Sequence, residues 1–242
     1  MRKNIIIMAL VALTLASCEE KSEKDTSYAP PQDLVLNSDI MTPEVLWSMN
    51  RLGEYAVSPD GKHVVYNLTY FNIPENKSKT DIYIIDIDGN NNRCLTKSFS
   101  NELSPTWNKD GSKILFMCAD SGDMQVWEMN PDGSERKQVS FVDGGITGFK
   151  YSPDESQLLF TAEVKLKDTV ADIYPDLPLS SGRVNNDLMY RHWDQWVDTY
   201  GHIFVTSDNG KIKLDIMEGE MWEAPVIPWG GMEQIAWTND GQ

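Results

Sequence analysis

Residues Tyr55–Tyr66 read YAVSPDGKHVVY, and this stretch decides the fold because it recurs along the chain. Related stretches are PTWNKDGSKILF at Pro105–Phe116 and FKYSPDESQLLF at Phe149–Phe160, and a fourth copy opens with IAWTNDG at Ile235–Gly241. The turn aspartates lie 50, 44 and 86 residues apart: Asp60, Asp110, Asp154 and Asp240. A unit that returns at this spacing indicates a repeat architecture.

Each copy predicts the first hairpin of a four-stranded unit. An aromatic-containing strand runs into a turn in which Asp caps its own backbone and Gly allows a positive φ, and an apolar strand such as Ile114–Phe116 follows. A second hairpin follows in each unit, with turns at Asp88-Gly89, Asp132-Gly133 and Asn209-Gly210. Four antiparallel strands per period of about 40–50 residues are typical of a β-propeller blade. The competing β-sandwich is not expected to restart with the same turn.

The interval of 86 residues between Asp154 and Asp240 holds either two blades or one blade with an insertion. The segment from Val164 to Gly201 contains no Asp-Gly turn and no alternating strand pair, so one blade with an insertion over about 164–201 is the better interpretation. We therefore expect an all-β fold over residues 41–242. It is a partial β-propeller of about three four-stranded blades and the start of a fourth, with one helical insertion.

Composition limits the classes of partner. The chain has 242 residues, and 37 Asp and Glu outnumber 21 Lys and Arg, which gives a net charge of −16. A charge of this sign repels phosphate backbones, so no nucleic-acid partner is expected. No Cys-x-x-Cys pair and no His-Glu-x-x-His helix occurs in the sequence, so neither a metal site nor another cofactor is predicted.

The N-terminus has the pattern of an export signal. Arg2 and Lys3 precede an apolar stretch from Ile5 to Ala16, which is shorter than the roughly 20 residues that span a bilayer. Leu15-Ala16-Ser17-Cys18 resembles the lipobox of bacterial lipoproteins, which implies cleavage after residue 17 and a lipid on Cys18. The polar residues 18–40 then form a flexible tether. A lipid-anchored protein of the cell envelope is expected, at its periplasmic face or at the cell surface; an ordinary cleaved signal is the alternative.

The remaining cysteines and the histidines carry no catalytic pattern. Cys94 and Cys118 lie in apolar, strand-like contexts, and two free thiols are favoured over a disulfide, whose distance the sequence cannot supply. His63 and His202 lie beside a turn and at the start of a predicted strand, so structural or solvent-facing roles are expected.

Three motifs resemble the prolyl oligopeptidase family of serine peptidases, in its dipeptidyl-peptidase 5 and acylaminoacyl-peptidase branch. They are Met41-Thr42-Pro43-Glu44 with Leu46-Trp47, the turn Ser58–Lys62, and Tyr190–Trp196 (YRHWDQW). The resemblance implies a propeller that filters peptide substrates above an α/β-hydrolase domain. It also implies an exopeptidase that releases dipeptides or acyl-amino acids from peptide N-termini. The alternative is a non-enzymatic propeller lipoprotein that acts as a protein-binding scaffold.

No catalytic residue of that family can be placed on this sequence. A Gly-x-Ser-x-Gly elbow, which presents the serine nucleophile on a strained strand-to-helix turn, is absent from the chain. The resemblance therefore implies that this chain is the propeller part and that its own C-terminal hydrolase domain lies beyond residue 242. Taken alone, the 242 residues are expected to be inactive as a peptidase.

The insertion is the candidate substrate-binding segment. Trp193, Trp196 and Tyr200 recur at helical spacing, which predicts two or three helical turns held against a blade by their aromatic face. The candidate binding residues are Arg191, Trp193, Asp194 and Trp196. The carboxylate of Asp194 is a candidate partner for a peptide α-ammonium group between flanking indoles. The alternative is a local Arg191–Asp194 ion pair with tryptophans that only fasten the insertion.

Overall fold

The computed structural model describes residues 38–165, 167–185, 191–192, 195–207 and 212–241. The predicted signal peptide, Cys18 and almost all of the tether lie outside these residues, as do Trp193 and Asp194 of the insertion. Of the helices within the described ranges, none has the length and apolar composition needed to cross a membrane.

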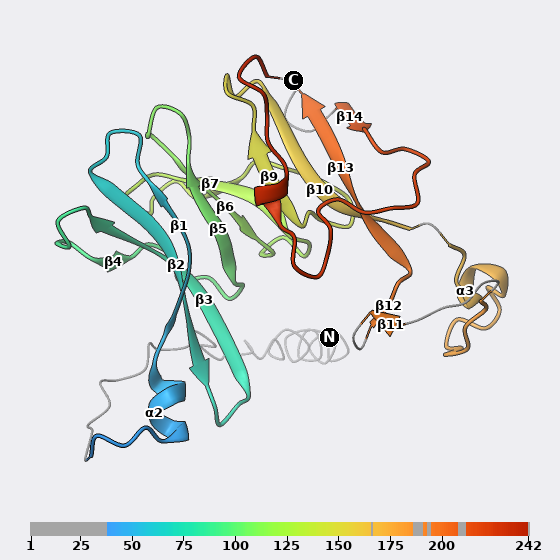
Figure 1. The fold of residues 1–242 in the computed structure, drawn as a ribbon, viewed down its shortest axis with the longest axis horizontal. Helices are drawn as coiled ribbons and strands as arrows, with labels where there is room; N and C mark the ends of the chain where they lie inside the picture. Colours follow the sequence, from blue (N-terminus) through green and yellow to red (C-terminus); the bar gives the residue numbers. More distant parts are fainter. Residues whose placement is uncertain (1–37, 166, 186–190, 193–194, 208–211, 242) are drawn as a thin grey trace, which may run out of the picture.

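Three antiparallel sheets of four strands each stand side by side like the leaves of a fan (Figure 1). The first contains β1 (Arg51–Val57), β2 (His63–Asn72), β3 (Lys77–Asp86) and β4 (Arg93–Cys94). The second contains β5 (Glu102–Trp107), β6 (Ile114–Cys118), β7 (Gln125–Met129) and β8 (Lys137–Gln138). The third contains β9 (Gly148–Tyr151), β10 (Gln157–Lys165), β13 (Thr199–Ser207) and β14 (Ile212–Asp215). The all-β prediction and the three four-stranded blades are confirmed.

The recurring aspartate builds each first turn in the same way. In the first blade, Ser58 Oγ donates to Asp60 Oδ1 at 2.6 Å, and the backbone N–H of His63 donates to Ser58 Oγ at 2.9 Å. In the third blade, Ser152 Oγ and Asp154 Oδ1 repeat the first of these contacts at 2.7 Å. Gly61 has φ +71°, the left-handed conformation that glycine adopts without steric cost. These local bonds explain why the motif marks the start of every blade.

The hydrophobic core lies between neighbouring sheets. Between the first two blades, Val65, Ile82, Ile114 and Phe116 are fully buried or nearly so. Between the second and third blades, buried side chains of Leu115, Val126, Leu158 and Phe160 form the equivalent layer. Each sheet therefore buries a face against the next one, which is the packing that a blade needs because it cannot cover both of its faces alone.

A tryptophan bond joins successive blades at equivalent positions of the repeat. Trp107 Nε1 on β5 donates to the carbonyl oxygen of Ala56 on β1 at 3.2 Å. Trp237 Nε1 donates in the same way to the carbonyl oxygen of Lys150 on β9 at 3.3 Å. The fourth copy of the repeat thus contacts the third blade as the second blade contacts the first.

The long interval contains one sheet with an insertion between its two middle strands. β10 and β13 pair along their whole length, from Gln157 with Ser207 to Lys165 with Thr199, and residues 166–198 leave the sheet between them. Within this insertion lie the short helix α3 (Val170–Ile173) and a hairpin of β11 (Arg191–His192) and β12 (Gln195–Trp196).

The helical prediction for the aromatic part of the insertion is wrong. Arg191 pairs with Trp196 across the hairpin, and Tyr200 belongs to β13, where it pairs with Val164. The aromatic residues share helical spacing, but antiparallel pairing with partners distant in sequence satisfies the same backbone groups in an extended conformation. His202 also differs from the prediction, because it lies inside β13 and is buried there rather than opening the strand.

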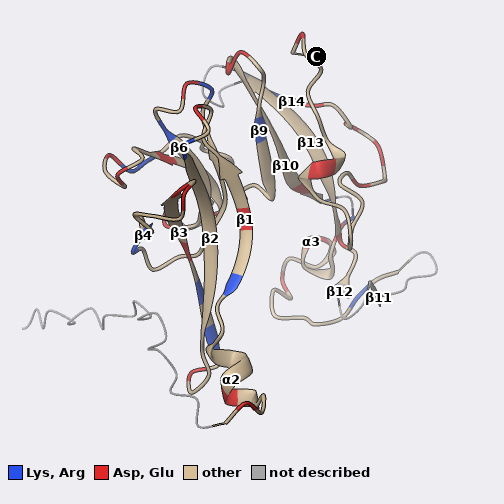
Figure 2. Ribbon diagram, turned by 60° about the vertical axis from the view of Figure 1, so that its left-hand side comes forward, with Lys and Arg blue, Asp and Glu red and all other residues tan. Residues whose placement is uncertain are grey.

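The two ends of the sheets differ in what they carry. The helix α2 (Pro43–Ser48) and the insertion lie at one end, opposite the aspartate turns, in both views (Figures 1 and 2). The segment that follows β14 returns to the insertion end, where Ala224 N–H donates to the Gly201 carbonyl at 2.9 Å, before the single turn η1 (Met232–Gln234). We call the end formed by α2, the insertion and residues 224–228 the insertion end.

Candidate functional site

A groove of about 970 Å³ runs where the first strands of the three blades converge. We call it the axial groove; β1, β5 and β9 line it together with residues beside and within η1. Its aromatic side chains are Tyr55, Trp107, Phe149 and Tyr151. A concave surface with aromatic walls and a few fixed polar groups is the usual form of a ligand-binding site.

Two matching bulges shape this groove. The pairing of β1 with β2 shifts between Leu52 and Tyr55, and that of β5 with β6 shifts at the equivalent place between Leu103 and Thr106. A bulge inserts an extra residue and re-aims side chains, which is why bulges are frequent beside binding sites. Here the bulges bring Glu54 of the first blade to Ser104 of the second.

Glu54 bridges the two blades on the groove side. Its Oε2 accepts hydrogen bonds from the backbone N–H of Ser104 at 2.8 Å and from Ser104 Oγ at 2.9 Å. Among the described residues, Oε1 of the same carboxylate has no hydrogen-bond donor. The carboxylate is exposed, so it is held in one place and stays open to a ligand.

The two lysines of the groove are held at backbone carbonyls. Lys109 Nζ donates to the Pro153 carbonyl at 2.9 Å, and Lys150 Nζ donates to the Ile235 carbonyl at 2.5 Å. Their ammonium groups are therefore fastened between blades and are not paired with Glu54. Glu155 and Glu233 add two further carboxylates to the lining, so acidic side chains outnumber basic ones in the groove.

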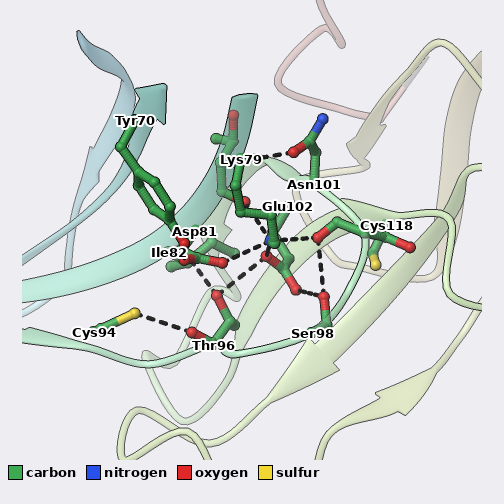
Figure 3. Close-up of polar contacts among 12 residues, drawn as sticks. Tyr70, Lys79, Asp81, Ile82, Cys94, Thr96, Ser98, Asn101, Glu102 and Cys118 are labelled. Carbon is green, nitrogen blue, oxygen red and sulfur yellow. Dashed lines mark hydrogen bonds and ion pairs between the residues drawn. The ribbon is translucent and has the colours of Figure 1, made fainter. Parts of the chain in front are cut away.

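A second cluster of charged groups is buried between the first two blades, away from solvent (Figure 3). Lys79 Nζ donates to Asp81 Oδ1 at 2.6 Å, to Glu102 Oε2 at 3.0 Å and to the Ser100 carbonyl at 2.5 Å. Tyr70 Oη donates to the other oxygen of Asp81 at 2.6 Å. Lys79 and Asp81 come from β3 and Glu102 opens β5, so the cluster joins neighbouring sheets.

Burial governs the ionisation of this cluster. Glu102 is fully buried, and desolvation raises the pKa of its carboxyl group, opposed by donors from Ser98 and Lys79. Arg136 Nη2 approaches Glu102 Oε1 at 3.4 Å, while its Nη1 donates to Asp120 at 2.6 Å. Since the side chains of Lys79, Asp81 and Glu102 are buried and each faces an opposite charge, the cluster joins the two blades.

The cysteines lie on either side of this cluster as separate thiols (Figure 3). Cys94 is half-buried and its Sγ donates to the Thr96 carbonyl at 2.9 Å. Cys118 is buried, and desolvation raises the pKa of its thiol to about 11. A thiol in that state is a poor nucleophile at neutral pH, so neither cysteine has the surroundings of a reactive one.

Two of the three histidines, His63 and His202, are held by carboxylates within their own blades. His63 Nδ1 lies 2.9 Å from Asp86 Oδ1, and His202 Nδ1 lies 2.9 Å from Asp215 Oδ2. Both pairs join neighbouring strands, which favours the structural role. Across the residues that the structure describes, no group of three or more His, Cys, Asp or Glu side chains is arranged to hold a metal ion.

Of the four residues predicted for the insertion site, Arg191 and Trp196 are described. The Arg191 guanidinium carbon lies 5.0 Å from the centroid of the Trp196 ring, and that of Arg183 lies 4.7 Å from the same ring. Arg183 also forms an ion pair with Asp198. The two predicted residues thus contact each other, but they are not among the residues that line the axial groove.

Sequence patterns missed two features. Glu54 directly precedes the first copy of the repeat, but only the structure reveals that its carboxylate reaches Ser104, which directly precedes the second copy. The buried cluster had a weak signal, because Lys79 and Asp81 alternate on one face of a strand that is otherwise rich in apolar residues.

Comparison with known proteins places the chain among propellers. The model of the TolB beta propeller domain matches residues 44–183. Dipeptidyl-peptidase 5 of Porphyromonas endodontalis is 42% identical over 99% of the chain and 35% of its own length. Dipeptidyl-peptidase 5 of Porphyromonas gingivalis is 46% identical over 84% of the chain and 30% of its own length. The chain thus spans about a third of the length of these relatives.

Among solved structures, the chain is similar in fold to the acylaminoacyl peptidase of Pyrococcus horikoshii. That peptidase superposes with a TM-score of 0.52 over 70% of the chain and 25% of its own length, at 17% identity. That similarity concerns the fold alone. With three stacked four-stranded sheets and a family match over more than half of its residues, the chain belongs to the TolB beta propeller domain family.

Proposed function

We propose that this chain is the propeller portion of an exported serine exopeptidase that releases dipeptides or acyl-amino acids from peptide N-termini. The observation that carries the proposal is its 42% identity to a dipeptidyl-peptidase 5 across 99% of the chain. Since the 242 residues contain no Gly-x-Ser-x-Gly elbow, the serine nucleophile and its partners belong to a hydrolase domain outside them. The propeller itself selects substrates by admitting or excluding peptides.

The insertion end supports a docking role toward that hydrolase domain. Large apolar side chains are exposed there: Trp47, Ile73, Leu177, Leu179, Val226 and Ile227. The opposite end carries the aspartate turns, where Asp60 and Lys62 are mostly exposed polar groups. Val57 and Ile87 are also exposed beside the aspartate turns, so apolar side chains occur at both ends. Those of the insertion end, which lie on several neighbouring elements, offer a surface that another folded unit can cover. In our proposal the hydrolase domain covers the insertion end, and the substrate lies between the two domains.

Within this arrangement, Arg191, Trp193, Asp194 and Trp196 remain the proposed contacts for the amino end of the peptide. The stacking of Arg191 on Trp196 supports an ordered hairpin. It equally fits the alternative in which these residues only fasten the insertion. The Asp194 carboxylate is the proposed partner of the α-ammonium group.

The experiment compares the chain with the longer reading frame that contains it. The longer protein is expected to cleave dipeptidyl or acylaminoacyl chromogenic substrates, and the purified 242 residues are expected to be inactive. A reading frame that ends after further blades, without the elbow, would favour the scaffold. Activity of the 242 residues alone would refute the assignment of catalysis to another domain.

The amine contact is tested by Asp194→Ala in the intact enzyme, with Asp176→Ala as a matched control on the same insertion. Asp194→Ala is expected to raise KM for substrates with a free amino terminus and to leave kcat nearly unchanged. An unchanged KM would show that Asp194 does not hold the ammonium group.

The proposed location is the cell envelope, through a lipid on Cys18. Two or more acyl chains anchor a soluble domain stably, since each buried CH₂ contributes about 0.8 kcal/mol. The substitution Cys18→Ser is expected to move the protein from the membrane fraction to the soluble fraction of fractionated cells. Membrane association that survives this change would exclude the lipid anchor.

A further inference from the structure

The axial groove has the walls and the charge of a binding site for basic peptides. β1, β5 and β9 are each the first strand of a sheet and are hydrogen-bonded to a single neighbour within it. Strands of this kind present backbone donors and acceptors to an extended peptide. Trp107 and Trp237 use two of these carbonyl groups, those of Ala56 and Lys150.

The fixed carboxylate of Glu54 gives the groove its charge preference. Because Ser104 holds Oε2, the Glu54 side chain loses less conformational entropy when Oε1 binds a ligand than a free side chain would lose. Lys109 and Lys150 are fastened to carbonyl oxygens and do not neutralise it. A cationic ligand would therefore meet an acidic group already in place.

Aromatic side chains line the same groove as that carboxylate. Tyr55 is the neighbour of Glu54 in the chain, is 69% exposed, and lines the groove with Trp107. A groove lined by a fixed carboxylate and by aromatic rings suits a lysine or arginine side chain, whose aliphatic stem packs on the rings while its charged end pairs with the acid. A purely apolar side chain keeps the packing on the rings but lacks the charge pairing, and an anionic side chain is repelled by the acid.

We propose that the axial groove binds extended peptides through a lysine or arginine side chain, with Glu54 as the counter-ion and Tyr55 and Trp107 as its aromatic walls. This inference deepens the proposed function, because it names the class of peptide that the propeller admits. It assigns a preference to the groove itself, separate from the insertion residues proposed to hold the amino end.

The test measures binding to the full chain by isothermal titration calorimetry. Three hexapeptides are used, each acetylated at the N-terminus and amidated at the C-terminus, with lysine, norleucine or glutamate at the third of six positions among alanines. The lysine peptide is expected to bind about fivefold more tightly than the norleucine peptide, and the glutamate peptide most weakly. The preference for lysine should diminish as salt is raised.

Two variants decide the role of Glu54. Glu54→Gln keeps an oxygen to accept from Ser104 but removes the charge, and should abolish the preference for lysine over norleucine. Glu135→Gln, a loss of the same charge beside Lys113 outside the groove, should retain the preference. Circular dichroism checks that both variants are folded.

Equal binding of the lysine and norleucine peptides, or a preference that survives Glu54→Gln, would overturn the inference. A peptide with a free amino terminus but no lysine should compete poorly with the lysine peptide. If it competes equally well, the groove binds α-ammonium groups, and the inference is also overturned. Because binding is measured without catalysis, failure of the proposed peptidase in the longer protein would leave this result unaffected. Conversely, if the longer protein is a peptidase and the groove shows no preference for lysine, only the inference about the axial groove is refuted.

Discussion

Replacing the buried Lys79 by methionine should lower the free energy of unfolding of the chain strongly, although it leaves the surface of the first two blades unchanged. Lys79 is 3% exposed, and its ammonium group holds the carboxylates of Asp81 and Glu102 at 2.6 and 3.0 Å. Methionine preserves most of the aliphatic volume but leaves both carboxylates enclosed without their shared counter-ion. The measured quantity is the free energy of unfolding of the chain.

The magnitude follows from what remains after the change. Removing one partner of a buried ion pair costs about 3–5 kcal/mol. Arg136 still approaches Glu102 at 3.4 Å and Tyr70 still donates to Asp81, so we expect the lower part of this range, about 3 kcal/mol. With a slope of about 2 kcal/mol per molar urea, the midpoint of unfolding should fall by about 1.5 M.

The assay is urea unfolding followed by tryptophan fluorescence, with two comparison variants. Lys62→Met removes a mostly exposed ammonium group 3.7 Å from Asp60 and should change the stability by less than about 0.5 kcal/mol. The double variant Lys79→Met/Glu102→Gln should recover about 1 kcal/mol or more relative to Lys79→Met, because it no longer buries a charge on Glu102 that has lost its Lys79 partner.

The pH dependence gives a second readout. Burial raises the pKa of Glu102 above that of the unfolded chain, so between the two values the folded state holds a proton that the unfolded state has lost. The stability of Lys79→Met should therefore fall as pH rises above the pKa that Glu102 has in the unfolded chain. Either of two results would show that Lys79 does not stabilise the buried carboxylates. One is a free energy of unfolding that falls by less than about 1 kcal/mol in Lys79→Met at pH 8, and the other is a double variant no more stable than Lys79→Met.

Three further predictions concern the repeat and the buried thiol. Trp107→Phe removes the indole bond to the Ala56 carbonyl and should lower the stability by about 1 kcal/mol in the same urea assay, whereas an unchanged midpoint would show that the bond contributes nothing. Hydrogen bonds from Ser152 and Ser156 lower the pKa of Asp154 to about 2. The contribution of Asp154 to stability is therefore present above the pKa of the unfolded chain and is lost as pH falls toward 2. An NMR titration should show the pKa of this carboxyl group rising in Ser152→Ala, and no rise would contradict this. Cys118 should react slowly with iodoacetamide at pH 8 and rapidly in urea, and rapid labelling of the folded chain would disprove its burial.

Local chemistry explains which structural predictions succeeded. The turn around Asp60 is built from Ser58, Asp60 and the first residues of the next strand, all within a few positions of one another. The blade hairpins follow from the same short-range bonds and from alternating apolar residues. Features that depend on neighbours in sequence could therefore be read without coordinates, including the interval that holds a single blade and its insertion.

The helix predicted around Trp193 and Trp196 failed for the opposite reason. Helical spacing describes one way to align these aromatic rings, but the backbone of the hairpin is satisfied by pairing Arg191 with Trp196. The pairing of Tyr200 with Val164, 36 positions earlier, extends β13 into the same region. Pairing over such distances is not encoded in a local pattern.

The repeat, the four-stranded blade and the absence of a serine elbow could all be predicted from the sequence, because each depends on residue identity at fixed short spacing. The tertiary structure alone decided that Glu54 meets Ser104 of the next blade and that Lys79 meets Glu102. In both cases the partners lie on different sheets. Their distance is set by how blades stack, so no pattern within one blade specifies it.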